Sequence, residues 1–99
     1  MLRITVTMDA DATSIVLEGR VVGAWAEELS TCWQRVRATA VGAIRVDLDG
    51  VAYIDEAGRI ILRAMCTDGA TLAATTLVMR AIAEEIAGAR DGQPRPVRP

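Results

Sequence analysis

The sequence predicts a small two-layer α/β domain with a mixed β-sheet, and three observations support that prediction. First, the apolar period changes between two and about 3.6 residues, in the order strand, strand, helix, strand, helix, strand, helix. Second, the later strands are separated by helical segments, which are typical of right-handed parallel crossovers. Third, the strands at 2–8 and 43–48 alternate apolar with polar residues, so the helices should pack mainly on one sheet face.

The first two strands are expected to form an antiparallel hairpin. Residues 2–8 alternate Leu, Ile, Val and Met with Arg and Thr, and residues 9–12 form an acidic turn. Residues 14–20 alternate less regularly. Gly19 indicates a bend and Gly23 the entry to a helix.

A first helix is expected from residue 24 to about residue 40, closed by Gly42. Its predicted core stripe is Trp25, Leu29, Cys32, Trp33 and Val36. The two tryptophans are interpreted as core or half-core residues, and a contact with a partner or with a second copy in a homodimer is the alternative.

The central part of the chain predicts a strand at 43–48 that resumes at 51–54, then a helix over residues 56–68. This second helix is expected to carry Ile61, Ala64 and Met65 on one face and to end at Gly69. A short strand at 70–74 follows.

A last helix is expected to be capped by Thr75 or Thr76 and to end at Gly88. Its predicted apolar residues are Val78, Met79, Ile82, Ala83 and Ile86. The domain is therefore expected to span residues 1–88, followed by a flexible, Pro-containing tail at 89–99.

Composition excludes several classes of function. The 99 residues are enough for one domain, and a net charge of −2 does not suit nucleic acid as the main partner. The chain has no histidine, which removes the commonest general base and zinc ligand. Cys32 and Cys66 are expected to be thiols rather than a disulfide. The sequence has no leader pattern and no membrane-spanning stretch, so a cytoplasmic protein without direct membrane insertion is expected.

The most informative segment joins the third strand to the second helix, at Asp55-Glu56-Ala57-Gly58. Unpaired backbone N–H groups and the positive end of the helix dipole lie at such a start. This position can be capped by Asp55, can hold an anion, or can carry a regulatory phosphate. The simplest interpretation makes Asp55 the N-cap, Glu56 a first-turn acid, and Gly58 a point of close approach to the sheet.

This segment resembles the STAS domains of anti-sigma factor antagonists and of the cytoplasmic tails of sulfate transporters. In that family a strand ending like residues 46–51 is followed by an apolar pair, here Tyr53-Ile54, and by Asp-Ser-Ser-Gly at a helix start. Residues 17–19, Leu-Glu-Gly, resemble the family's Leu-x-Gly before its first helix. The resemblance extends over about residues 2–88, and it implies a SpoIIAA-like fold.

The resemblance also implies a function and a departure from it. In the antagonists, the second serine accepts a phosphate from a partner kinase that is also the anti-sigma factor, and the unphosphorylated form frees the sigma factor. Ala57 occupies that position and Glu56 the first serine's, while Asp55 and Gly58 match. A phosphoacceptor is therefore not expected at residue 57, and the binding state should be fixed.

We therefore expect a non-catalytic binding module with no cofactor and no metal site. Its predicted partner-binding residues are Asp55, Glu56, Ala57, Gly58, Arg59 and Arg63. Arg59 and Arg63 are expected to share an exposed helix face, either as solvated charges or as ligands for an acidic partner group. The expected partner is an anti-sigma factor or serine kinase. The alternative is a stand-alone STAS adaptor subunit bound to a transporter ATPase or a larger signalling complex. Asp47 and Asp49 are expected on the outward strand face, without the spacing of a metal site.

Overall fold

The computed structural model describes residues 1–40 and 42–90, and it has the element order that the sequence predicts. The elements are β1 (Leu2–Met8), β2 (Ala12–Val21), α1 (Gly23–Thr39), β3 (Ala43–Ile54), α2 (Glu56–Thr67), β4 (Thr71–Ala73) and α3 (Leu77–Arg90). The helix α3 continues past Gly88, so the predicted helix end was two residues early. The predicted tail lies outside the described residues except for its first two.

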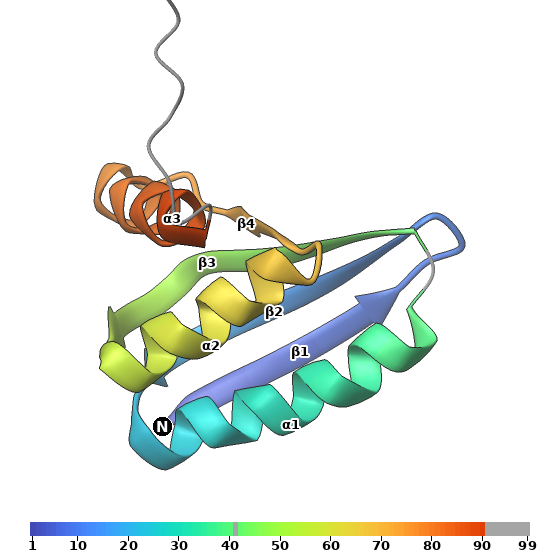
Figure 1. The fold of residues 1–99 in the computed structure, drawn as a ribbon, viewed down its shortest axis with the longest axis horizontal. Helices are drawn as coiled ribbons and strands as arrows, with labels where there is room; N and C mark the ends of the chain where they lie inside the picture. Colours follow the sequence, from blue (N-terminus) through green and yellow to red (C-terminus); the bar gives the residue numbers. More distant parts are fainter. Residues whose placement is uncertain (41, 91–99) are drawn as a thin grey trace, which may run out of the picture.

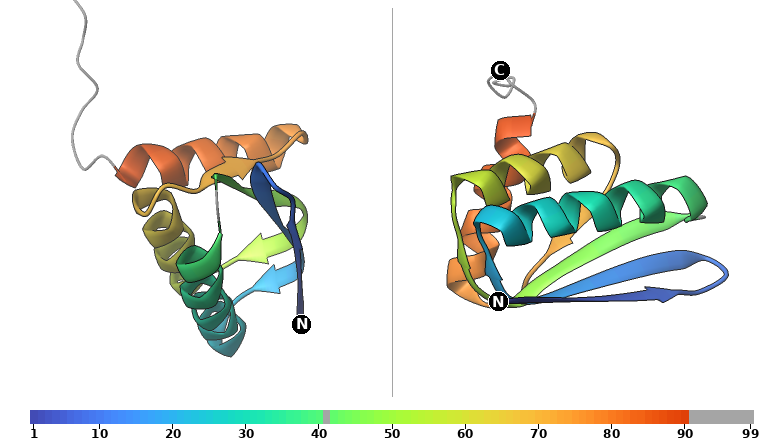
Figure 2. Two further views of the ribbon diagram at one scale, coloured as in Figure 1. Left: turned by 90° about the vertical axis from the view of Figure 1, so that its right-hand side faces the viewer. Right: turned by 90° about the horizontal axis from the view of Figure 1, so that it is seen from below.

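The four strands form one mixed sheet in the order β1-β2-β3-β4. The strands β1 and β2 pair antiparallel, while β2–β3 and β3–β4 pair in parallel. The helices α1 and α2 lie side by side over one face of this sheet, and α3 lies at the sheet edge that β4 forms (Figures 1 and 2). The predicted two-layer α/β fold is therefore confirmed, with the third helix at the sheet edge.

The strand β3 is continuous where the sequence predicts an interruption. Its pairing with β2 shifts register twice, between Val16 and Glu18 and between Gly19 and Arg20. These irregularities let Leu48, Val51 and Ile54 all face the core although they are three residues apart.

The core lies between the sheet and the helices and is almost entirely aliphatic. Trp33 is its aromatic member, and its indole N–H donates to Asp68 Oδ2 at 2.9 Å. Arg37 Nη1 lies 3.1 Å from the same oxygen, Asp68 Oδ2, so the second half of α1 is joined to the residue that follows α2. The buried core residues are Leu2, Ile15, Leu17, Val21, Ala26, Leu29, Trp33, Val36, Val46, Leu48, Val51, Ile54, Leu62, Met65, Ala70, Met79, Ala83 and Ile86.

Two residues of the predicted apolar faces are not buried, since Val78 is 69% exposed and Ala64 is exposed. Trp25, predicted as core or half-core, is 39% exposed and lies at the margin of the core. Each helix is turned slightly from its predicted orientation, since α2 buries Leu62 and Cys66, and α3 buries Met79 instead of Val78. When the apolar stripe of a helix is wider than its contact with the core, the sequence does not determine the rotation of the helix about its own axis. Tertiary packing then decides which residues are buried.

The entry to α3 is held on the sheet by a pair of hydrogen bonds. Thr75 donates from its backbone N to Asp49 Oδ1 at 2.6 Å and from Oγ1 to Asp49 Oδ2 at 2.9 Å. Thr76 Oγ1 then accepts from Met79 N at 3.3 Å, as expected of a cap. These bonds, with the one from the Thr75 backbone largest, hold the pKa of Asp49 below its usual value.

The lowered pKa of Asp49 predicts a pH-dependent contribution to stability. A carboxylate with a lower pKa in the folded state stabilises the fold above its unfolded-state pKa of about 3.9, and that stability is lost as pH falls through the folded-state value. We expect Asp49→Ala to lower the melting temperature at neutral pH and the difference from wild type to shrink below about pH 4. Thermal melts over a pH series test this, with Asp11→Ala in the hairpin turn as control. A difference that does not change with pH would contradict it.

Candidate functional site

The helices α1 and α2 begin next to each other, beside the C-terminal ends of the parallel strands β2 and β3. This follows from the parallel pairing of β2 and β3, which ends at the pair Val21 and Ile54. After β2 the chain enters α1 at Gly23, whose φ is 49°. After β3 it enters α2 through Asp55, whose backbone N donates to Val21 O at 3.2 Å. Two helix starts with unpaired N–H groups therefore meet around one carboxylate.

Asp55 caps both helices. Its Oδ1 accepts from Gly58 N at 2.8 Å, which makes it the N-cap of α2 as predicted. Its Oδ2 accepts from Gly23 N at 3.0 Å, and Val22, the N-cap residue of α1, makes no side-chain capping bond. The cap of the first helix therefore comes from a residue 32 positions later. Both carboxylate oxygens are engaged within the fold, which leaves Asp55 mainly a positioning residue.

Gly58 brings the first turn of α2 into contact with the end of β2. A Cβ atom at this position would lie 2.3 Å from Val21 O and 2.8 Å from Ile54 Cγ2. Gly58 is buried, so it cannot contact a partner directly. Its predicted role in the close approach between helix and sheet agrees with this geometry.

Glu56 and Ala57 are the exposed residues of the motif. They occupy the first two positions of α2, where a negative group is favoured by the helix dipole. A phosphorylated side chain at position 57 would lie at this positive end. Ala57 has a methyl group and no oxygen, so the position is accessible but has no nucleophile.

The two arginines of the predicted site do not share a fully exposed face. Arg59 Nη1 lies 2.9 Å from Glu85 Oε1, which turns this side chain toward α3. Arg63 follows four residues later on the same side of α2 and is half-buried. The prediction of a shared exposed face is therefore wrong, because α3 covers that side of the helix.

The exposed face of α2 instead borders an apolar groove between α1 and α2. Its volume is about 350 Å³, and it is lined by Ala26, Glu27, Ser30, Ala57, Ile60, Ile61 and Ala64. Ile60 is 55% exposed. Ile60 is not among the residues predicted for the site, although the run Ile60-Ile61-Leu62 indicates an exposed apolar residue, because three consecutive apolar residues of a helix cannot all face one core.

The thiol of Cys32 has a pKa raised mainly by burial, with Arg35 acting in the opposite direction, whereas reactive thiols have lowered values. Within residues 1–40 and 42–90 no group of three or more His, Cys, Asp or Glu side chains could hold a metal ion. In the same part of the chain no helix is both long and apolar enough to span a membrane.

Comparison with solved structures identifies this architecture. An anti-sigma factor antagonist from Mycobacterium paratuberculosis superposes with a TM-score of 0.76 at 19% identity, covering 98% of this chain and 87% of that chain. The chain has the fold of the anti-sigma factor antagonists. The anti-sigma factor antagonist SpoIIAA in its unphosphorylated form gives a TM-score of 0.63 at 14% identity, over 81% of this chain and 80% of that chain. The predicted STAS fold is therefore confirmed.

The same fold also occurs as one part of a longer chain. The crystal structure of Mglu matches with a TM-score of 0.57 and 21% identity, over 73% of this chain but 19% of that chain. No protein-family model and no curated protein matches this sequence. The similarity is thus one of fold.

Proposed function

We propose that this chain is a non-catalytic regulatory module that binds a protein partner through the start of α2 and the groove beside it. The observation that carries the proposal is the exposure of Glu56, Ala57 and Ile60 on one continuous surface next to an apolar groove. We call these three residues and the groove lining the docking surface. Arg59 and Arg63 lie at its margin, and Asp55 and Gly58 hold the helix start in place.

The docking surface is proposed to be permanently in one state. A phosphate at the helix start would bring a charge of about −1.5 to −2, whereas Glu56 brings −1 at all times and one position earlier. Without a hydroxyl at residue 57, a kinase cannot add charge there. Regulation of binding would then come from the partner or from the amount of this chain.

The chemistry of the docking surface favours a partner segment with an apolar centre and basic flanks. Ile60 and Ala57 offer aliphatic surface, and Glu27 and Glu56 place two carboxylates beside it. Apolar anchors in a groove with complementary charges at the rim are typical of protein–protein recognition. An anti-sigma factor or serine kinase with such a segment is the proposed partner.

Affinity capture from the native host tests this proposal. Wild type is compared with Glu56→Arg, Ile60→Arg and the control Glu84→Arg, which alters an exposed residue of α3, and retained proteins are identified by mass spectrometry. We expect an anti-sigma factor or kinase to be retained by wild type and the control but lost with both docking-surface variants. Retention that all four proteins share would contradict the location of the surface.

A second candidate function is favoured by the match to part of the longer Mglu chain. A fold that also occurs within a larger chain suits an adaptor subunit bound to a transporter ATPase or a signalling assembly. Retention of such a protein in the capture experiment, independent of added nucleotide, would support the adaptor over the antagonist.

The missing hydroxyl leads to a testable gain of function. We expect Ala57→Ser to fold with a stability within about 0.5 kcal/mol of wild type, because residue 57 is an exposed first-turn position. With the partner kinase and ATP, this variant should gain one phosphoryl group at Ser in position 57, and its binding should weaken. Intact-mass spectrometry and titration measure both effects, with Ala64→Ser as a control serine on the same exposed helix face. Modification of both variants alike would contradict a specific acceptor position.

A further inference from the structure

The strand β1 is the outer strand of the sheet, and half of its backbone groups have no partner in β2. Hydrogen bonds at both ends of the hairpin establish the alternation: Arg20 N donates to Met1 O at 2.9 Å, and Asp9 N donates to Ala12 O at 2.8 Å. In an antiparallel ladder, bonded and non-bonded pairs alternate. The odd-numbered residues of β1 therefore bond to β2, and the even-numbered residues turn their N–H and C=O groups to the outer edge, where no strand within residues 1–40 and 42–90 pairs with them. These are Leu2, Ile4, Val6 and Met8.

This edge lacks the features that usually prevent further pairing. Exposed edge strands are commonly protected by proline, lysine or a bulge. The β1 sequence contains neither residue type, and its pairing with β2 runs without a register shift. Its charged residue, Arg3, points to the open sheet face, and Arg3 Nη1 lies 3.9 Å from Glu18 Oε1.

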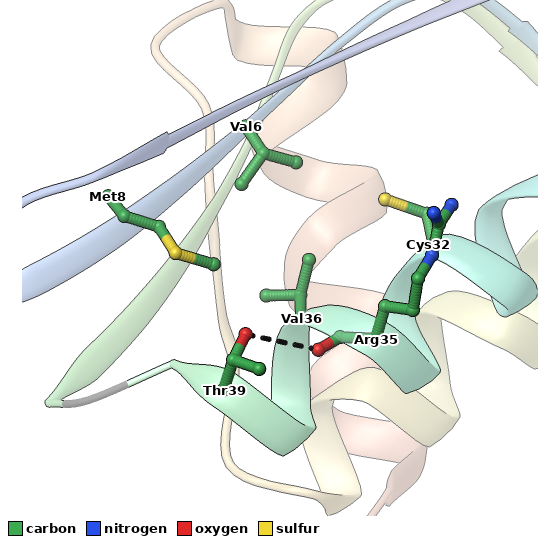
Figure 3. Close-up of a pocket in the computed structure, with 6 residues that line it drawn as sticks. All are labelled: Val6, Met8, Cys32, Arg35, Val36 and Thr39. Carbon is green, nitrogen blue, oxygen red and sulfur yellow. Dashed lines mark hydrogen bonds between the residues drawn. The ribbon is translucent and has the colours of Figure 1, made fainter.

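Apolar side chains are exposed along the same edge. Val6 is 37% and Met8 is 50% exposed. Both line a hollow of about 280 Å³ between β1 and the second half of α1, with Cys32, Arg35, Val36 and Thr39 on the helix side (Figure 3). The free backbone groups and the exposed apolar surface thus belong to one continuous strip of the molecule.

We infer that this strip is the interface of a homodimer in which β1 pairs antiparallel with β1 of a second copy, about a two-fold axis at Thr5. This register opposes Leu2 with Met8 and Ile4 with Val6, so every residue with free backbone groups meets another such residue. It also places Arg3 opposite Thr7 rather than opposite a second arginine. The two sheets then form one continuous eight-stranded sheet.

The α1 helices of the two copies also present complementary charges to each other across the same two-fold axis. Trp25, Glu28, Cys32, Arg35 and Thr39 follow one another at spacings of three and four residues, so they share one flank of α1. Cys32, Arg35 and Thr39 place that flank on the β1 side (Figure 3). The helix α1 and the strand β1 run in the same direction (Figures 1 and 2). The axis therefore sets the two α1 helices antiparallel and brings Glu28 of one copy toward Arg35 of the other.

This charge match favours a second copy over an unrelated strand. Any extended peptide could bond to the free edge of β1, but a peptide would leave the outer flank of α1 uncovered. The second copy satisfies the strand and the helix flank with the same symmetry operation. The docking surface on α2 is separate from this interface, so the two proposals can fail independently.

Sedimentation of the full chain over a concentration series tests the homodimer. We expect wild type to dimerise and Val6→Pro to weaken dimerisation about tenfold or more, because it removes one interchain bond per copy without removing a bond to β2. Arg35→Glu should weaken the dimer about fivefold, and the added Glu28→Arg should restore it. Glu27→Arg, which faces the groove beside α2, is the control and should have no effect. A wild-type monomer throughout, or a folded Val6→Pro that dimerises as wild type does, would overturn the inference.

Amide exchange of the wild-type protein gives a test that needs no substitution. With increasing protein concentration, the amides of Leu2, Ile4, Val6 and Met8 should become protected, while those of Arg3, Thr5 and Thr7 should change little because β2 already protects them. Exchange rates of the even-numbered amides that do not depend on concentration would contradict the interface.

Discussion

Replacing Gly58 with alanine is expected to destabilise the domain by about 3 kcal/mol, since the new Cβ would overlap backbone and side-chain atoms at the end of the sheet. The nearest atom, Val21 O, is 2.3 Å from the Cβ position and belongs to a strand that cannot move away easily. The melting temperature should fall by more than about 10 °C. Chemical denaturation followed by circular dichroism measures the loss.

Gly88→Ala is the matched control for that substitution. Gly88 lies on α3, is exposed, and has no atom within 4 Å of a Cβ position outside its own helix backbone. Here alanine should stabilise the helix by about 0.5–1 kcal/mol. Equal effects of the two substitutions would mean that Gly58 does not hold α2 against β2.

Asp55→Ala is expected to cost about 2 kcal/mol, because one carboxylate caps two helices. Asp55→Asn should lower the free energy of unfolding by about half as much as Asp55→Ala does. Its single carbonyl oxygen can still accept from Gly58 N, while its amide NH₂ would face the Gly23 N–H, donor against donor.

The distinction between alanine and asparagine checks the double cap directly. Denaturation midpoints of wild type and both variants should fall in the order wild type, asparagine, alanine. The amide of Gly23 should exchange faster in both variants, and the amide of Gly58 in the alanine variant alone. An asparagine variant as stable as wild type would contradict the role of Oδ2 in capping α1.

Much of this fold could be predicted because each element has a clear period and clear end signals. The alternation in β1, the caps at Asp55 and Thr76, and the turn glycines at 23 and 69 all act locally, and the structure confirms them. The parallel order of the later strands follows from the crossover helices between them.

Orientation of the helices could not be predicted, because it depends on contacts between distant residues. Val78 and Met79 are adjacent and similarly apolar, and the packing of α3 on β3, β4 and α2 decides which of them is buried. Likewise, Glu85 lies 26 positions from Arg59, and no local pattern connects them. The second bond of Asp55, to Gly23, is a long-range contact of the same kind.

The position of the motif at the start of α2 was predicted, but the arrangement of its side chains was not. The motif at residues 55–58 marked the start of α2, yet two of its four residues are engaged within the fold and two are exposed. The exposed surface continues to Ile60 and to α1, so its extent depends on how the two helices pack. We therefore propose Glu56, Ala57 and Ile60 as the main docking residues, in place of Arg59 and Arg63.

The most direct test of the central claim measures binding of wild type to its captured partner before and after incubation of the two proteins with ATP. We predict that the affinity stays the same within about twofold, that the intact mass of this chain is unchanged, and that Ile60→Arg weakens binding at least tenfold, as loss of a central apolar anchor does. A gain of one phosphoryl mass on the wild-type chain together with loss of binding would contradict a permanently fixed state.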